Sequence, residues 1–327
     1  MSDSVSIQVP ARLHLGFLDI PGKTGLRFGS IGLPLEGIST RLTIARAAET
    51  TVEGKETARI LDHLAKLGPH LGLSGHHRIV VHEAIPDHAG LGSGTQLALA
   101  VSAALRTLHG LPFDVSADAV FLGRGTRSGI GVAAFEEGGL ILDAGKGSRD
   151  QTPTVISRQH FPEEWRAILV FDGCAQGIHG EAEISAFREL PSFPATSSAA
   201  ICRHVLMGIM PALIEKDILA FGDAVTAIQR EVGNYFAPAQ GGLFTSPAVE
   251  ATLTQLAAAG AVGIGQSSWG PTGFAFAASQ AAAERIIAAA RPEAGTTIRI
   301  LGGRNGGAKI IRSVTPPRFA MEHERHN

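Results

Sequence analysis

The segment Ile85-Pro-Asp-His-Ala-Gly-Leu-Gly-Ser-Gly-Thr-Gln96 decides the fold of this 327-residue chain. It leads directly into apolar side chains that recur every three and four residues, from Leu97 to Leu108, which predicts a helix ending at Gly110. A glycine loop at a helix N-terminus offers backbone N–H groups and the positive end of the helix dipole to phosphate or pyrophosphate. The pattern is neither GxxxxGK[ST] nor GxGxxG, so a tight turn without a ligand is the alternative. The candidate phosphate-binding residues are Gly90, Leu91, Gly92, Ser93, Gly94, Thr95 and Gln96.

The elements around this loop alternate between the two periodicities. Before it we expect strands near residues 4–17, 39–47 and 77–83 and a helix at 58–67. After it we expect strands at 140–143, 165–171, 296–301 and 308–314, with helices at 199–210, 216–232, 248–259 and 280–290. The uncharged stretch 251–283 is interrupted midway by glycines, so we read it as helix, strand, loop and strand rather than as a membrane span.

Composition excludes several classes of partner. The 28 Lys and Arg residues nearly balance the 30 Asp and Glu residues, so no net field attracts nucleic acid or an acidic membrane, and an anionic ligand must be held locally. The N-terminal residues alternate like a strand and lack the features of a signal peptide. Cys174 and Cys202 form no CxxC motif, which fits a reducing compartment. We therefore expect a cytoplasmic protein that binds neither nucleic acid nor membranes.

Two further clusters of charge are candidates for the site. Arg124 and Arg127 lie in a second glycine-rich stretch, 123–131, where guanidinium groups suit bidentate contacts to phosphate or carboxylate, although a solvated loop explains them equally well. In the first segment, Arg12 and His14 share one face of a strand. Asp19 and Arg27 flank the turn that follows. A lone strand histidine is more often structural than catalytic.

These residues together resemble the GHMP kinase superfamily. The segment from Pro86 matches its loop Pro-x3-Gly-Leu-Gly-Ser-Ser-Ala, and residues 263–272 match its Gly-x-Gly-Pro-Thr motif. The resemblance implies an α+β fold with two GHMP-kinase-like domains, which we place at residues 1–155 and 156–327.

Within this superfamily the chain is most similar to the β-ribofuranosylaminobenzene 5′-phosphate synthases. Five motifs carry the similarity: Arg-x-His-x-Gly at 12–16, Gly-Leu-Gly-Ser-Gly-Thr-Gln at 90–96, Arg-Gly-x-Arg-Ser-Gly-Ile-Gly at 124–131, Gly-Gln-Ser-x-Trp-Gly-Pro at 265–271, and Asn-x-Gly-Ala at 305–308. They span nearly the whole chain. They add Gln266, Ser267, Trp269 and Asn305 to the residues expected to bind substrate.

One departure from the kinases bears on mechanism. Many GHMP kinases carry an aspartate in a Ser-Gly-x-Asp setting that helps to activate the acceptor hydroxyl, whereas here Ser128-Gly-Ile is followed by Gly131. The expected base is missing, although Asp143 and Lys146 lie nearby in sequence as substitutes. This weakens a kinase function without excluding it.

The resemblance implies a decarboxylating phosphoribosyl transfer. The family joins 4-aminobenzoate to 5-phosphoribosyl diphosphate, releases carbon dioxide and diphosphate, and acts in tetrahydromethanopterin biosynthesis. Stabilising the leaving diphosphate requires donors, cations and Mg²⁺, for which Ser93 and Asp143 are the candidate ligands. We expect Arg12, His14, Asp19 and Arg27 to line the catalytic cleft, with His14 orienting groups or carrying protons.

The remaining assignments stay open at this point. Arg27, Arg124 and Arg127 are candidates for the substrate anions, and Trp269 or Phe17 for stacking on an aromatic ring. The acceptor is 4-aminobenzoate or 4-hydroxybenzoate, and a homodimer is open. The alternative functions are an ATP-dependent small-molecule kinase of the GHMP type and a non-catalytic nucleotide-binding protein.

Overall fold

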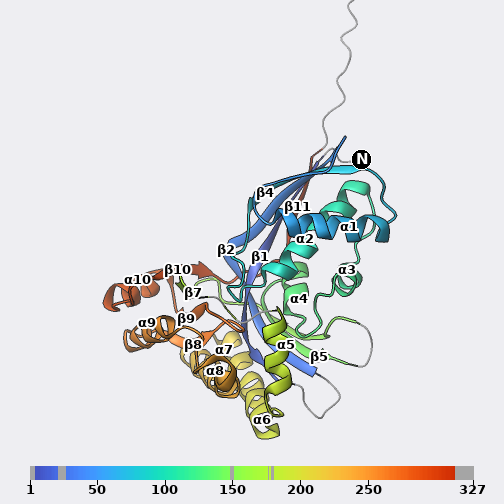
Figure 1. The fold of residues 1–327 in the computed structure, drawn as a ribbon. Coiled ribbons are helices and arrows are strands. Elements are labelled where there is room, and N and C mark those ends of the chain that lie inside the picture. The colour runs from blue at the N-terminus through green and yellow to red at the C-terminus, as the bar shows by residue number, and fades with distance from the viewer. Residues whose placement is uncertain (1–3, 21–26, 148–150, 176, 178–179, 314–327) are drawn as a thin grey trace, which may run out of the picture.

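The computed structural model describes residues 4–20, 27–147, 151–175, 177 and 180–313. It confirms the α+β class: the chain forms two sheets, each accompanied by helices (Figure 1).

The first sheet has seven strands: β1 (Ser4–Phe17), β2 (Arg27–Ala47), β3 (Thr51–Glu53), β4 (His76–Glu83), β5 (Leu140–Lys146), β6 (Val155–Gln159) and β11 (Lys309–Ser313). Its main path runs β11-β1-β2-β4-β3. The 21-residue strand β2 pairs with β4 through its second half and with β5 through its first, and β6 lies beyond β5. Strand alternation puts Val5, Ile7 and Val9 of β1 into the core.

Four helices accompany this sheet: α1 (Thr57–His70), α2 (Ser93–His109), α3 (Val115–Phe121) and α4 (Ile130–Glu136). Helix α2 packs on β1 and β2 and is buried from Gln96 to Leu108. Gly110 takes the left-handed conformation, with φ of 70°, and ends the helix at the predicted residue. Burial on this scale fixes the N-terminus of α2 rigidly in the molecule.

The second sheet has four strands: β7 (Arg166–Asp172), β8 (Val262–Gln266), β9 (Gly273–Ala277) and β10 (Thr296–Gly302). They are antiparallel in the order β10-β7-β9-β8. The helical elements of this half are α5 (Gly180–Glu189), α6 (Ala195–His204), a π-helical turn (Val205–Ile209), α7 (Met210–Glu215), α8 (Ile218–Gln240), α9 (Pro247–Ala258) and α10 (Gln280–Ala289).

The two sheets do not correspond to two consecutive halves of the chain. Strand β6 pairs with β5, and the last described strand, β11, returns to pair with β1. Residues 156–159 and 309–313 therefore lie in the first sheet, whereas the expected division after residue 155 would assign them to the second domain.

Two apolar stretches of the second half raise the question of a membrane span. The stretch 251–283 folds as most of α9, then β8, β9 and the start of α10, as its glycines predicted. Among the described residues, only the helical run Ala195–Glu215 is long and apolar enough to span a membrane, and 28% of its apolar window is buried inside the protein. Its exposed side chains include Leu206, Met207 and Ile214.

Candidate active site

The predicted phosphate loop, residues 90–96, lies at the N-terminus of α2. Gly90 and Gly92 both have positive φ, of 73° and 82°, and Gly92 is the N-cap of the helix. A Cβ at Gly90 would lie 2.1 Å from the carbonyl oxygen of Ser267, so only glycine fits there. Gly92 brings no side chain, so the N-cap residue makes no side-chain hydrogen bond to the first-turn N–H groups.

Two arginines flank this first turn. A Cβ at Gly94 would lie 3.0 Å from Nη2 of Arg59 and 3.1 Å from Nη1 of Arg124. Burial, together with the charge of Arg59, lowers the pKa of the Arg124 guanidinium. The structure thus places Arg124 at the phosphate loop and adds Arg59 from α1, which no motif indicated.

An acidic residue completes this end of the site. Oδ1 of Asp87 accepts hydrogen bonds from Ser93 Oγ at 2.8 Å and from Nη1 of Arg59 at 2.7 Å. Burial raises the pKa of Asp87, but the Ser93 hydrogen bond and the Arg59 charge outweigh it and hold the pKa below its usual value. Arg59 is also paired with Glu56 at 2.8 Å. The sequence interpretation missed Asp87 although it lies inside the quoted segment.

The residues at this loop fit a magnesium ion that takes most of its ligands from substrate. Mg²⁺ prefers oxygen ligands and keeps several waters, and Ser93 and Asp87 supply two adjacent oxygens. The described residues contain no cluster of three or more His, Cys, Asp or Glu side chains that could hold a metal.

Asp143 has the surroundings of a structural carboxylate. It is fully buried and accepts hydrogen bonds from Ser30 Oγ at 2.5 Å, Gly129 N at 3.0 Å and Gly145 N at 2.8 Å. Burial raises its pKa to about 6, against the opposing effect of those hydrogen bonds. These contacts fasten the turn before α4 to β5, so they favour Asp87 over Asp143 as a partner of Ser93 in metal binding.

Arg12, His14 and Ser267 connect β1 to the phosphate loop. Nη1 of Arg12 donates to the Gly90 carbonyl at 2.6 Å. Ser267 Oγ donates to the same carbonyl at 2.7 Å and accepts from the His14 backbone N–H at 3.0 Å. Three segments far apart in sequence therefore meet at one carbonyl oxygen, and each carries one of the predicted motifs.

Burial sets the charge of these side chains. It lowers the pKa of Arg12 to about 10, an effect that nearby Glu183 opposes, so Arg12 stays cationic at neutral pH. His14 is 3% exposed, and its burial and the Arg12 charge lower its pKa to about 3. His14 is therefore a neutral imidazole at physiological pH.

An aromatic cluster lies beside His14. It consists of Phe17, Phe28, Phe187, Phe236 and Trp269. The His14 ring centroid is 4.4 Å from that of Phe17, and the Trp269 centroid is 4.2 Å from that of Phe236. Within the described residues, Nε1 of the buried Trp269 has no hydrogen-bond partner. Both aromatic residues expected to stack on substrate thus belong to one cluster.

Helix α5 contacts Arg127 and contributes Phe187 to the aromatic cluster. Nη1 of Arg127 lies 2.5 Å from Oε1 of Glu183, and the Arg127 guanidinium lies 5.0 Å from the Phe187 ring centroid. Upstream of the helix, the Gly177 N–H donates to the His88 carbonyl at 3.3 Å. Glu183 had no signal in the sequence, because an acidic residue on a polar helix usually faces solvent.

The other predicted residues lie at the edges of this arrangement. Asp19 follows β1 and lies close enough to Cys202 of α6 to raise its pKa, an effect second to burial. Arg27 begins β2 in register with Lys146, but its side chain lies outside the described residues.

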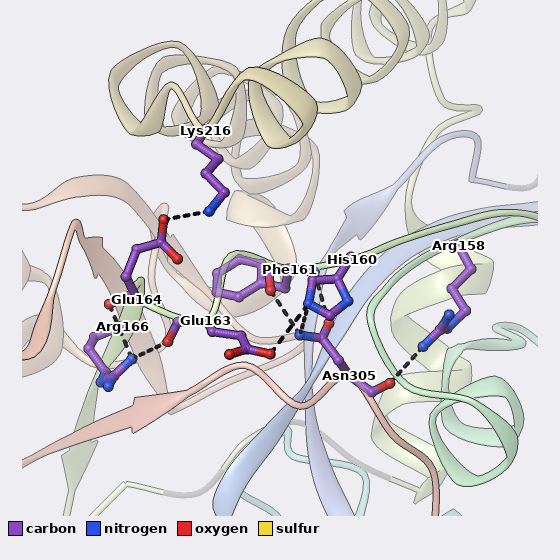
Figure 2. Close-up of polar contacts among 8 residues, drawn as sticks. All are labelled: Arg158, His160, Phe161, Glu163, Glu164, Arg166, Lys216 and Asn305. Atoms are coloured by element: carbon purple, nitrogen blue, oxygen red, sulfur yellow. Dashed lines mark hydrogen bonds and ion pairs between the residues drawn. The ribbon is translucent and has the colours of Figure 1, made fainter.

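Asn305 binds the backbone of the segment that connects the first sheet to the second. Its Oδ1 accepts from the Phe161 N–H at 2.8 Å, and its Nδ2 donates to the Phe161 carbonyl at 2.9 Å. Arg158 donates to the Asn305 carbonyl at 2.6 Å (Figure 2). Both amide atoms are thus engaged with backbone, and none of the hydrogen bonds described for Asn305 involves the phosphate loop.

A cavity away from the phosphate loop has a lining of different charge. It measures about 810 Å³ and lies between α3, α4 and the segment 151–155. Its charged lining residues are Asp114 and Glu136, whose carboxylates repel phosphate. The cationic loop, rather than this cavity, is therefore the candidate site.

Comparison with known proteins identifies the family of the chain. The family model for the GHMP kinase N-terminal domain matches residues 55–139, and the model for the C-terminal domain matches residues 209–296. The β-ribofuranosylphenol 5′-phosphate synthase of Methanothermobacter thermautotrophicus is 32% identical over 333 residues, covering 94% of this chain and 98% of the relative. The chain belongs to this synthase family. The synthase of Archaeoglobus fulgidus is also 32% identical, over 93% of this chain and 98% of its own.

Membership in the β-ribofuranosylphenol 5′-phosphate synthase family confirms that the protein is an enzyme of this kind. Solved structures confirm the fold. Homoserine kinase from Cytophaga hutchinsonii superposes with a TM-score of 0.70 at 18% identity, covering 95% of this chain and 98% of the kinase. Mevalonate diphosphate decarboxylase from Staphylococcus aureus gives a TM-score of 0.69 at 16% identity, with 95% and 99% covered.

Proposed function

We propose that the enzyme transfers the phosphoribosyl group of 5-phosphoribosyl diphosphate to the carboxyl-bearing carbon of a para-substituted benzoate, with loss of carbon dioxide and diphosphate, in tetrahydromethanopterin biosynthesis. The observation that carries this proposal is the meeting of Arg59 and Arg124 at the bare N-terminus of α2, next to a buried aromatic cluster. One side suits a diphosphate and the other an aromatic ring.

The donor side matches the demands of a diphosphate leaving group. As the bond from ribose C1 to the diphosphate oxygen breaks, the electron pair goes to diphosphate and ribose C1 gains oxocarbenium character. First-turn N–H groups and the guanidinium groups of Arg59 and Arg124 stabilise the developing anion. Mg²⁺ held by Ser93 and Asp87 would neutralise part of the remaining charge when bound.

The acceptor side must protect this reactive carbon from water. The carboxyl-bearing ring carbon forms the new bond to ribose C1, and the electron pair of the bond to carbon dioxide then restores aromaticity. Water would compete for the same carbon, so the site must be dry. The buried His14 and Trp269, and the cover that α5 makes through Glu183 and Arg127, support this role.

Two acceptors fit this chemistry. The motifs pointed to 4-aminobenzoate. The name of the curated relatives specifies a ribofuranosylphenol, which corresponds to 4-hydroxybenzoate. Both para groups donate electron density to the attacking carbon, so each must be assayed.

The decisive experiment supplies Mg²⁺, 5-phosphoribosyl diphosphate and carboxyl-labelled 4-hydroxybenzoate or 4-aminobenzoate to the purified enzyme. We expect labelled carbon dioxide and diphosphate in equal amounts, with a ribosyl phosphate product of the matching mass. A donor that binds without releasing label with either acceptor contradicts the proposal. ADP formation from ATP with an alcohol acceptor instead identifies a kinase.

A further inference from the structure

A small cavity lies between β1, α8 and the loop after β8. Its volume is about 20 Å³, and its lining includes His14, Phe17, Phe236, Gln240 and Gln266. This is room for one water-sized polar group. Its lining combines aromatic and polar side chains.

Among the imidazole and amide side chains described in this lining, His14 is the one with a buried polar atom that lacks a hydrogen-bond partner. The side chains of Gln229, Gln240 and Gln266 all have hydrogen-bond partners, most of them backbone groups. Nε2 of His14, by contrast, is buried without a hydrogen-bond partner among the described residues. A buried polar atom left unpaired is costly, which indicates that a ligand completes it.

We propose that this cavity receives the para-hydroxyl or para-amino group of the aromatic acceptor, which hydrogen-bonds to Nε2 of His14 while the ring lies against Phe17 and Phe236. This inference rests on the proposed transfer reaction. We place the carboxyl-bearing carbon toward the phosphate loop because Ser267 bonds both to the Gly90 carbonyl and to the His14 backbone, which brings this part of β1 next to the loop. The carboxyl-bearing carbon then faces the loop, and the para group points away from it.

The unpaired Nε2 in the cavity and the neutral charge of His14 favour the para group, rather than the carboxylate, at this position. A neutral imidazole provides no counter-charge for a buried carboxylate, whose desolvation is expensive, whereas its lone pair accepts readily from O–H or N–H. As the ring carbon bonds to ribose C1, positive charge develops on the para oxygen or nitrogen. The hydrogen bond to Nε2 strengthens at that moment and weakens again when carbon dioxide leaves.

The test measures binding by calorimetry in Mg²⁺ and inorganic diphosphate, so that it does not depend on turnover. We expect the wild type to bind 4-hydroxybenzoate about tenfold more tightly than benzoate, the typical value of one hydrogen bond. His14→Leu abolishes this preference, and His14→Gln keeps part of it. His77→Leu, which replaces another buried histidine on β4, keeps it fully. A preference that persists in His14→Leu, or is absent from the wild type, overturns the inference.

A second measurement covers the case in which His14→Leu does not fold. In ¹⁵N-histidine-labelled wild type, we expect one ring resonance to shift with 4-hydroxybenzoate and not with benzoate; no such shift overturns the inference. The label-release assay separates the two proposals. A preference that depends on His14 without release of carbon dioxide retains the subsite and refutes the transfer, and the reverse result refutes the subsite alone.

Discussion

Thr95 fills the space in which a side chain at position 131 would begin. A Cβ at Gly131 would lie 2.9 Å from Cγ2 of Thr95, and the Gly131 carbonyl accepts a hydrogen bond from Nε2 of Gln96 at 2.7 Å. The phosphate loop and the start of α4 are therefore fitted to each other. The aspartate of the related kinases has no room here, which argues against the use of that base.

We predict that Gly131→Asp lowers the free energy of unfolding by about 1–3 kcal/mol, the usual cost of overpacking. Adding Thr95→Ala to Gly131→Asp should restore part of the lost free energy of unfolding, because the side chains at positions 95 and 131 compete for the same space. Denaturant titration of the single and double variants measures this coupling. Strictly additive effects would show that the two positions do not compete.

Donor binding should depend on the two arginines at α2. We expect Arg59→Ala and Arg124→Ala each to weaken 5-phosphoribosyl diphosphate binding by roughly tenfold to a hundredfold, because hydrogen bonds to charged groups are worth about 1.5–3 kcal/mol. Arg41→Ala is the control, since Arg41 lies on β2 in an exposed pair with Glu83. Equal affinities for all four proteins in calorimetry would remove the arginines from the site.

The two glycines that bound α2 give a matched pair. Gly92 and Gly110 both have left-handed backbone, so alanine strains either one. A Cβ at Gly92 would also lie 3.1 Å from Cζ and Nε of Arg12, whereas a Cβ at Gly110 meets nothing within 4 Å. We expect both variants to lose similar stability, about 1 kcal/mol. Only Gly92→Ala should lose donor affinity, and a similar loss in Gly110→Ala would assign the effect to helix strain.

Asp143 should make stability depend on pH. Burial raises the pKa of Asp143 from 3.8 to about 6. Its contribution to the free energy of unfolding is therefore complete below pH 4 and is lost as the pH rises to 6. The whole change amounts to roughly 3 kcal/mol. The buried histidines act in the opposite direction, since their lowered pKa values reduce stability as the pH falls. The difference between wild type and Asp143→Asn isolates the carboxylate. A difference that is constant from pH 4 to pH 6 would contradict this account.

The sequence was sufficient where local signals agreed. Alternation predicted β1, and apolar spacing with Gly110 predicted α2, so the loop between β4 and α2 was placed correctly. The sequence did not predict the first half of β2, because Gly29, Gly32 and Pro34 interrupt the strand pattern there. The strand forms because its pairing with β1 and β5 outweighs these local preferences.

The site was predictable only where motifs marked it. The structure brings Arg12, His14, Ser267 and Arg124, which all lie in motifs, to the phosphate loop. Arg59 and Glu183 lie on helices without a motif and are functional candidates only through their position. Asn305 shows the opposite case. Its motif is specific, yet its amide holds the backbone of Phe161.

The pairing of β11 with β1 has a consequence for synthesis of the chain. The sheet that holds the phosphate loop begins at Ser4 but receives its last strand from residues 309–313. Until residues 309–313 have been synthesised and folded, the edge of β1 therefore remains open along Ser4 to Gln8. A truncation that removes residues 309–313 would leave that edge free to pair with another molecule.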